Sequence, residues 1–280
     1  MKFVTYEDVE VDGRRVGYLD GDAVVDAGFD GDMLAFIEAG APIGTTRSVA
    51  NAVLRAPLRP RTLRDFLGFE GHLLNVFPRL GQKIPEEWYQ VPAYYKGIPG
   101  TVIGPDEEIP WPAYMEQLDH ELELAAVIGR PGKDITEGNA ISHVFGYTIW
   151  NDLSARDVQT RELPVGMGPG KAKDWDGSNV LGPCLVTADE VDPHDVDLEV
   201  RVNGERWGGA NTKEMHHTFE SMIAYASQAL TLHPGEVLGS GTATGGSGLE
   251  LNRWLDAGDV IEMEASRIGV LRNTIGRRPA

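Results

Sequence analysis

The segment at 119–129, with the sequence DHELELAAVIG, constrains the fold more than any other part of the chain. Its apolar run predicts a β-strand, in which successive side chains point to opposite faces. Glu121 and Glu123 then share one face, about 7 Å apart, while Leu122 and Leu124 point into a core. Two carboxylates on one face repel each other unless a cation lies between them. The pair therefore predicts either a strand edge with solvated acids or a site for a hard divalent cation.

A further acid downstream favours the metal site. The apolar run at 144–150 predicts a second strand, and Asp152 follows it in the motif WNDLSARD (150–157). Three carboxylates from two strands are enough to hold Mg²⁺, with water or substrate oxygens completing an octahedron. Mn²⁺ and Ca²⁺ accept the same oxygen ligands, so the sequence leaves the choice of metal open.

The charge balance excludes some classes of partner. The 280 residues include 25 Lys and Arg but 43 Asp and Glu, which gives a formal net charge of −18. A chain with this charge has little attraction for nucleic acid or for an anionic membrane surface. A metal and a few basic side chains still allow an anionic small molecule to bind locally. We therefore expect a small-molecule substrate, and no nucleic-acid or membrane partner.

The expected location follows from what the sequence lacks. Cys184 is the single cysteine, so no internal disulfide can form, as is usual in a reducing compartment. The N-terminal residues lack the basic and then apolar pattern of a signal peptide. No apolar run approaches the ~18 residues that a membrane span needs. These observations predict a cytoplasmic protein.

The pattern along the chain predicts two domains. Alternating residues between 3 and 26 predict a β-meander, and a short helix is expected at 31–39. The proline-punctuated segment 55–60 is typical of a linker. Residues 1–60 are therefore expected to form a small β-rich domain, and residues 61–280 a larger domain that carries the acids.

Strands dominate the pattern of the larger domain. We expect one long helix at 214–230, opened by two histidines. A second helix is expected within 62–80, with Thr62 or Asp65 as its cap. The predicted fold class is therefore α+β, and mostly β.

Basic and polar side chains follow the acid at 152. Arg156 and Gln159 are three residues apart, so on a helical turn they share a face. Lys173, in the run GKAKDWDG (170–177), is suited to anchor a carboxylate or enolate oxygen. Arg156 is explained equally well as a structural salt-bridge former.

Four motifs occur in the order and spacing of one known family. They are DHELELAAVIG (119–129), GYTIWNDLSARDVQ (146–159), GKAKDWDGSNVLGP (170–183) and GSGTATG (239–245). Over roughly residues 62–270 the chain resembles the fumarylacetoacetate hydrolase family, and its N-terminal region looks like the small β-domain often attached there. The resemblance implies a mixed β-roll or barrel core, a homodimer, and Mg²⁺ or a similar divalent ion.

The resemblance also assigns roles to individual residues of this chain. By alignment with the family motifs, the metal ligands would be Asp65, Glu121, Glu123 and Asp152. The catalytic residues would be His72, Lys173 and Glu250. The substrate-binding residues would be Tyr95, Arg156, Gln159 and Thr242.

The chain departs from the family pattern at two positions that would affect the substrate pocket. Short members of the family pair the histidine with a glutamate three residues on, where this chain has Asn75. The acid partner of His72 must then come from elsewhere, and Glu70 and Glu250 are the candidates. Leu67 replaces a tyrosine of the longer members, so we expect a different pocket shape.

The resemblance implies a divalent-metal-dependent hydrolase. Its substrate would be a β-diketo acid of the acylpyruvate or fumarylacetoacetate type, cleaved at a C–C bond in the catabolism of aromatic compounds. His72 would activate the water, and Lys173 would stabilise the departing enolate. The same chemistry suits an oxaloacetate decarboxylase, a 2-oxo-alkenoate hydratase or a tautomerase, and Asn75 keeps these alternatives open. A cation-binding domain without turnover explains less, because it has no use for Arg156 and Lys173 beside the acids.

Overall fold

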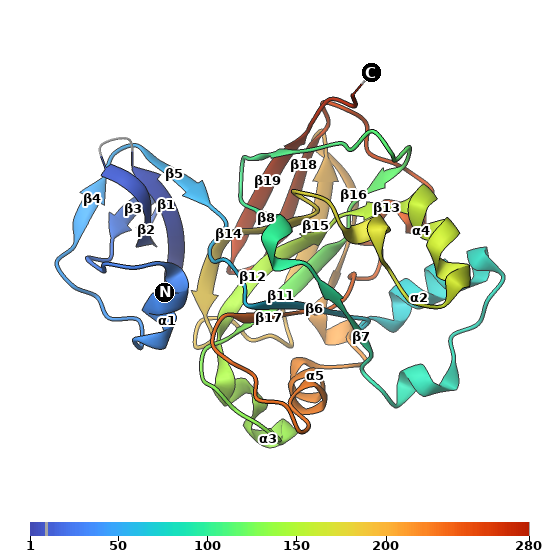
Figure 1. Cartoon of the computed structure of the whole chain (residues 1–280), viewed down its shortest axis with the longest axis horizontal. Helices are drawn as coiled ribbons and strands as arrows, with labels where there is room; N and C mark the ends of the chain where they lie inside the picture. Colours follow the sequence, from blue (N-terminus) through green and yellow to red (C-terminus); the bar gives the residue numbers. More distant parts are fainter. Residues whose placement is uncertain (9–10, 280) are drawn as a thin grey trace.

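Strands dominate the structure, a computed structural model that describes residues 1–8 and 11–279 (Figure 1). The strands are β1 (Lys2–Asp8), β2 (Val11–Asp20), β3 (Ala23–Asp26), β4 (Arg47–Val49), β5 (Ala52–Arg55), β6 (Thr62–Phe66), β7 (Tyr94–Gly97), β8 (Val102–Ile103), β9 (Glu108–Ile109), β10 (Leu118–Asp119), β11 (Leu122–Ile128), β12 (Val144–Asp152), β13 (Ser154–Ala155), β14 (Asn179–Thr187), β15 (Asp197–Val202), β16 (Glu205–Asn211), β17 (Glu236–Gly239), β18 (Val260–Ala265) and β19 (Gly269–Ile275). The α-helices are α1 (Met33–Glu38), α2 (Glu70–Val76), α3 (Glu137–Ala140), α4 (Arg156–Glu162), α5 (Phe219–Ala226) and α6 (Gly248–Leu251). Short 3-10 helices include η1 (Phe77–Leu80), η2 (Glu86–Tyr89), η5 (Leu163–Val165) and η6 (Lys171–Lys173).

Two large sheets organise these strands. The first is 12-stranded among the described residues, in the order β4-β3-β2-β1-β14-β12-β11-β17-β6-β7, with β5 beside β1 and β8 beside β14. The second is 5-stranded over the same residues, in the order β16-β15-β18-β19-β9. Neither hydrogen-bonded path closes on itself within the described part of the chain. The predicted α+β, mostly β class is confirmed, with mixed sheets rather than a continuous closed barrel.

The N-terminal strands form the predicted meander. β1, β2 and β3 pair antiparallel in sequence order, and α1 lies beside them at the left of Figure 1. The side chain of Asp32 caps α1 by accepting a hydrogen bond from the Ala35 amide at 2.8 Å. β1 also pairs with β14, so this unit extends the large sheet. A division into domains at 1–60 and 61–280 stays a prediction.

Strand β11 lies in the middle of the large sheet, between β12 and β17. Both of its faces are buried, since Leu122 and Leu124 belong to one hydrophobic cluster and Ala125 and Val127 to another. The first cluster also contains Met263 of the second sheet, so the two sheets share a core. Burial on both faces explains why this strand is an almost unbroken apolar run.

The pairing of β17 with β6 decides which acids meet. These two strands run parallel with Asp65 opposite Gly239, and Gly239 lies opposite Ala125 of β11. A Cβ atom at position 239 would lie 2.5 Å from a carboxylate oxygen of Glu123. Glycine at this position therefore leaves the space in which Asp65 and Glu123 approach each other.

The helix expected within 62–80 starts later than its predicted caps. Thr62 and Asp65 lie on β6, which is held in a sheet by β17 on one side and β7 on the other. The helix α2 begins at Glu70 and has no side-chain cap. Long-range strand pairing thus overrides the local capping signal.

The helix expected at 214–230 is also shorter than predicted. The α-helix α5 covers only Phe219–Ala226, and the histidines at 216 and 217 precede it instead of opening it. The amide of His216 donates a hydrogen bond to the carbonyl of Gly68 at 2.8 Å, which holds this segment against the loop before α2. A tertiary hydrogen bond therefore replaces the first turn.

Candidate active site

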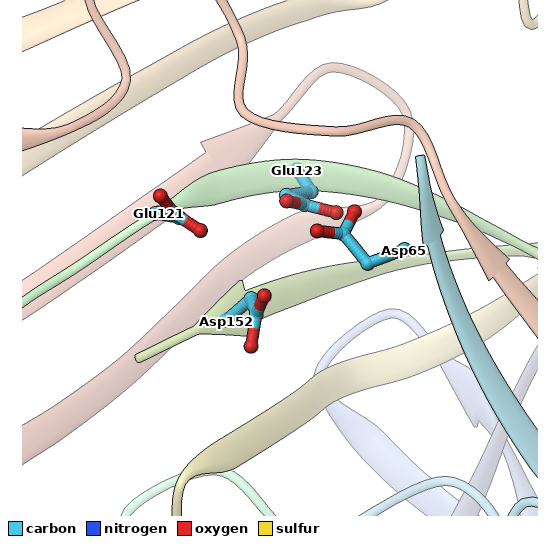
Figure 2. Close-up of side chains that lie close together, drawn as sticks. All are labelled: Asp65, Glu121, Glu123 and Asp152. Carbon is cyan, nitrogen blue, oxygen red and sulfur yellow. The ribbon is translucent and has the colours of Figure 1, made fainter. Parts of the chain in front are cut away.

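Four buried carboxylates meet in the large sheet (Figure 2). One oxygen from each of Asp65, Glu121, Glu123 and Asp152 lies within 4.8 Å of the others. Asp65 is on β6, Asp152 ends β12, Glu123 is on β11, and Glu121 immediately precedes that strand. We call this group the acid cluster. Three separate stretches of sequence supply it, and adjacent pairing of their strands brings them together.

Within the described residues, no lysine or arginine forms an ion pair with Asp65 or Glu123 at one end of the acid cluster. Burial raises the pKa of Asp65 well above its ordinary value, and the nearby Asp152 raises it further. Burial also raises the pKa of Glu123, with Asp65 and Asp152 adding to the effect. Burial and the neighbouring carboxylates therefore disfavour the charged form of both groups, and a bound cation would favour it.

Unsatisfied oxygens show where a cation fits. No hydrogen-bond donor in the described part of the chain reaches Oδ1 of Asp65, Oδ1 of Asp152 or either carboxylate oxygen of Glu123. Buried acceptors without a donor are rare, because each costs ~1–3 kcal/mol of desolvation. A buried set of oxygen ligands suits a hard divalent ion. The acid cluster is thus a candidate divalent-metal centre, and its residues leave the identity of the ion open.

Lys173 and Arg156 compensate the other end of the cluster. Lys173 Nζ forms an ion pair with Glu121 and a second one with Asp152, at 2.6 Å from Oδ2. Burial alone would lower the pKa of Lys173, but the two carboxylates outweigh it and raise the pKa above its ordinary value. Arg156 Nη2 lies 2.6 Å from Glu121 Oε1. Burial would raise the pKa of Glu121, but Lys173 and Arg156 hold it below its usual range.

Asp119 connects this arginine to helix α6. Its Oδ2 accepts a hydrogen bond from Arg156 Nε at 2.7 Å. Its two oxygens accept hydrogen bonds from the amides of Gly248 and Leu249, at 2.8 and 3.0 Å. Arg156 also donates to Gln159 at 2.9 Å, so it combines a structural ion pair with a place in the site. The sequence analysis assigns no role to Asp119, although its position as the first residue of the 119–129 motif indicates that it lies near the acids.

His72 has an acid partner. Its Nδ1 lies 3.1 Å from Oε2 of Glu250, and both side chains are buried. Glu250 forms a capping box with Ser247, and it accepts hydrogen bonds from the Gly245 amide at 2.9 Å and from Asn75 Nδ2 at 2.8 Å. Burial would raise the pKa of Glu250, but the contacts with His72 and Asn75 lower it below its ordinary value. Of the two candidate acids, Glu250 is the one that the fold brings to His72.

A cavity of about 670 Å³ joins these features. The residues selected by the sequence that line it are Asp65, His72, Tyr95, Glu121, Arg156, Gln159, Lys173 and Thr242. The remaining three lie behind its wall: Glu123 beside Asp65, Asp152 beside Lys173, and Glu250 beside His72. Tyr95 Oη donates a hydrogen bond to Oδ2 of Asp152 at 2.5 Å. The candidate residues therefore surround one cavity, and their individual roles stay proposals.

Aromatic and histidine side chains hold the loop before α2 against η2. Trp88 Nε1 donates a hydrogen bond to the carbonyl of Leu67 at 2.9 Å, and His217 Nε2 donates to the carbonyl of Trp88 at 2.6 Å. The Trp88 ring also contacts the rings of Tyr89 and His216. These contacts tie η2 to the segment that leads into His72, so they support one wall of the cavity.

Acid is expected to destabilise the folded protein at His217, because the charged ring is buried. Burial lowers the pKa of His217 below its ordinary value, so the folded protein binds this proton less readily than the unfolded chain does. The stability that depends on neutral His217 is present above the unfolded-state pKa of ~6.5 and is lost as the pH falls toward the lower folded-state pKa. We expect the Tm to fall less in His217→Gln than in the unsubstituted protein between about pH 7.5 and about pH 5.5.

The exposed His233 supplies a control for this measurement, because it lies outside these contacts and its printed hydrogen bonds are through its backbone. The variant His233→Gln should follow the unsubstituted protein. Equal falls in Tm for all three proteins would contradict the role given to His217.

The fold and the site define a strand-rich protein with a candidate divalent-metal centre and a histidine–glutamate pair on one cavity. A family model described as fumarylacetoacetate (FAA) hydrolase C-terminal matches residues 61–276. The chain therefore belongs to the fumarylacetoacetate hydrolase family, and the resemblance seen in its motifs is confirmed.

Individual relatives differ in the reactions that their names describe. The mitochondrial oxaloacetate tautomerase fahd2 of Xenopus laevis is 38% identical over 194 residues, which are 69% of this chain and 59% of that protein. A fumarylacetoacetate hydrolase from Exiguobacterium antarcticum is 30% identical, with a TM-score of 0.83 over 99% of this chain and 100% of its own. The 5-carboxymethyl-2-hydroxymuconate delta-isomerase of Mycobacterium smegmatis is 28% identical, with a TM-score of 0.80 over 99% and 100% of the two chains. The names of these three relatives thus describe three different reactions within one family.

Location and assembly stay predictions. In the described part of the chain, no helix combines the length and the apolar character that a membrane crossing requires. The name of the Xenopus relative places that protein in mitochondria, so the expected cytoplasmic location of this chain is unconfirmed. The expected homodimer is likewise untested.

Proposed function

We propose that this protein is a divalent-metal-dependent tautomerase or isomerase, which moves a proton within a 2-oxo acid, most simply between its keto and enol forms. The observation that carries this proposal is the His72–Glu250 pair, placed on the same cavity as the acid cluster. A tautomerase and an isomerase among the relatives support it. We therefore prefer this alternative to the hydrolase expected from the motifs.

We assign the proton of a neutral His72 to Nδ1, which lies 3.1 Å from Oε2 of Glu250, so that Nε2 can accept a proton from the substrate. In the proposed reaction, Nε2 takes a proton from the carbon next to the 2-oxo group and delivers it to the 2-oxo oxygen, which gives the enol and restores the neutral imidazole. In the reverse direction, Nε2 takes the proton of the enol hydroxyl and returns it to the carbon. Glu250 fixes the ring and stabilises the imidazolium that forms.

We propose that Mg²⁺ is the ion of the acid cluster, with Asp65, Glu121, Glu123 and Asp152 as its ligands. When bound, it supplies a Lewis acid that stabilises negative charge on the oxygens of a 2-oxo acid. Mn²⁺ satisfies the same oxygen ligands and is the comparison to make in activity measurements.

Polar residues around the cluster are proposed to position the substrate. Lys173 and Arg156 place positive charge at the end of the cavity where the substrate carboxylate would bind. Tyr95 orients Asp152 through its hydrogen bond, while Gln159 and Thr242 line the cavity and offer hydrogen-bonding side chains.

A second candidate is hydrolysis of the C–C bond of an acylpyruvate. The same His72–Glu250 pair favours it, since a paired histidine can also take a proton from water. In this reaction water adds to the distal carbonyl, and the bond breaks to release a carboxylic acid and the enolate of a 2-oxo acid. The solved hydrolase from Exiguobacterium antarcticum supports this candidate by its similarity.

Ultraviolet absorbance of enolised 2-oxo acids separates the two candidates. Purified protein with Mg²⁺ is mixed with freshly dissolved enol-oxaloacetate, and with acetylpyruvate, while the products are identified by chromatography. Faster loss of the enol signal with no new acid supports tautomerisation, and formation of two acids supports hydrolysis. Release of CO₂ would indicate a decarboxylase. No metal-dependent change with any substrate would contradict both candidates.

A substitution at Lys173 tests whether the protein is an enzyme or a domain that only binds a cation. Replacement by methionine removes a positive charge beside Glu121 and Asp152, so we expect the affinity for Mg²⁺ to be kept or increased. We also expect kcat to fall by about 10²-fold, because the developing negative charge loses a preorganised partner. Calorimetric titration with Mg²⁺ and enzyme kinetics measure the two effects. Unchanged kcat would remove Lys173 from the mechanism.

A further inference from the structure

Away from the acid cluster, the wall of the cavity is apolar. Residues of α2, η1 and the segment after α4 form this part, which we call the distal wall. It includes Leu73, Val76, Phe77 and Met167. These residues come from separate segments, so the apolar surface is a property of the assembled cavity.

The distal wall offers little to a second carboxylate. Of the lysine and arginine side chains on the described wall, Arg156 and Lys173 are already tied to carboxylates at the metal end. Lys96, on β7, is exposed and in contact with solvent. A carboxylate placed against the apolar side chains would lose its hydration without gaining a buried cation, which is strongly unfavourable.

The cavity is also large for a short diacid. Its volume of about 670 Å³ lies within the range of roughly 300–1,000 Å³ found for sites that enclose drug-sized ligands. A four-carbon acid held at the acid cluster would leave most of the distal wall uncovered. The volume and the lining thus favour a ligand with an apolar extension.

One side chain at the mouth of the cavity supports this conclusion. Met167 lines the cavity but is 88% exposed, which is unusual for a large apolar side chain beside a site. An apolar ligand group resting against it would remove this surface from water. Methionine adapts its shape to varied apolar partners, so it suits this position.

We propose that the preferred substrate is a 2-oxo acid whose other end is an aromatic or branched aliphatic group, which packs on the distal wall. This inference rests on the proposed function for the 2-oxo acid end. It adds that the second end is apolar rather than a carboxylate. The distal wall then determines specificity, while the acid cluster and His72 serve the reaction.

Three oxamates that cannot enolise test the inference without turnover. Oxamate has no extension, N-oxalylglycine ends in a carboxylate, and N-benzyloxamate ends in a phenyl ring. Their affinities are measured by calorimetric titration of the Mg²⁺-loaded protein. We expect N-benzyloxamate to bind at least about tenfold more tightly than either of the others, as burial of an aromatic ring predicts.

Two variants in one loop locate the effect. Met167→Ser should reduce the preference for the benzyl group, while Val165→Ser should not, because Val165 is 71% exposed and lies off the cavity wall. Phe77→Ala, checked for an unchanged circular dichroism spectrum, should reduce it further. A benzyl preference that survives both Met167→Ser and Phe77→Ala would overturn the assignment to the distal wall.

Each of the other possible results of the oxamate titrations also tests the inference. Tighter binding of N-oxalylglycine, lost in Lys96→Met, would show that the distal end takes a carboxylate and would overturn the inference. Equal binding of all three oxamates would overturn it as well. A benzyl preference in a protein that turns over no 2-oxo acid would contradict the proposed function and leave the apolar site standing.

Discussion

Replacement of His72 by alanine is expected to lower kcat by about 10²–10⁴-fold, the range that a general acid–base group contributes. The expected loss follows from the position of the ring, which lines the cavity with Nδ1 toward Glu250 and leaves Nε2 for the substrate. The substitution removes no residue of the acid cluster, so the affinity for Mg²⁺ should change little. Steady-state kinetics and calorimetric titration with Mg²⁺ measure the two quantities on the same protein.

Glu250→Gln tests whether the acid acts through His72. The amide oxygen can still accept the hydrogen bonds from the Gly245 backbone and from Asn75, while the NH2 group replaces the oxygen that faces His72 and the Ser247 amide. We expect a smaller loss of kcat than in His72→Ala, together with a change in the pH profile, because the charge that stabilises the imidazolium is removed. His194→Ala, on the exposed surface, is the control. Normal turnover in His72→Ala would exclude the proposed role of His72 as the general base.

Exchange of Glu123 for glutamine is expected to raise the stability of the metal-free protein and to lower the stability of the metal-loaded protein. Without the ion, Glu123 is a buried carboxyl group beside Asp65 and Asp152, and its removal relieves an unfavourable arrangement. With the ion, the substitution removes a ligand. Saturation at 100 times Kd stabilises a protein by about 2.7 kcal/mol, and we expect this gain to disappear in the variant at the same Mg²⁺ concentration.

Thermal unfolding with Mg²⁺ and with a chelator measures both directions. Glu137→Gln, a substitution at an exposed position in the first turn of α3, is the matched control and should keep the full response to the ion. Turnover should also be lost in Glu123→Gln. An unchanged rise in Tm on addition of Mg²⁺ would show that the ion binds elsewhere.

The partner of His72 shows where sequence reasoning reached its limit. Asn75 stands where short family members have the glutamate, and two acids remained as candidates. The fold resolves this ambiguity, because Glu250 reaches His72 across the sequence, while Asn75 donates a hydrogen bond to Glu250 instead of replacing it. Glu70 accepts a hydrogen bond from Tyr89 at 2.6 Å. The substitution at 75 therefore changes how the acid is supplied and still leaves the histidine paired.

The reaction was predicted less well than the family. The motifs favoured a hydrolase, whereas the relatives include a tautomerase and an isomerase, so the stated alternative gained support. These reactions share an enolate and a nearby base, and they differ in which atom the base approaches. Residue types alone do not record that difference, because a histidine can take a proton either from a carbon or from a water molecule.

The sequence by itself predicted a strand within 119–129, of which residues 122–128 form β11, and it identified the acids Glu121 and Glu123 and the family. The alternation of Glu121, Leu122 and Glu123 is local, and a strand turns such a pattern into two faces wherever it lies. Only the tertiary structure decided that Asp65 joins the cluster from a strand, that Glu250 meets His72 and that Asp119 holds Arg156. These contacts depend on the parallel pairing of β6 with β17 and on the path of the loop into α6, which bring distant residues together. Local propensity has no information about such pairing, and so it placed a helix cap where the sheet required a strand.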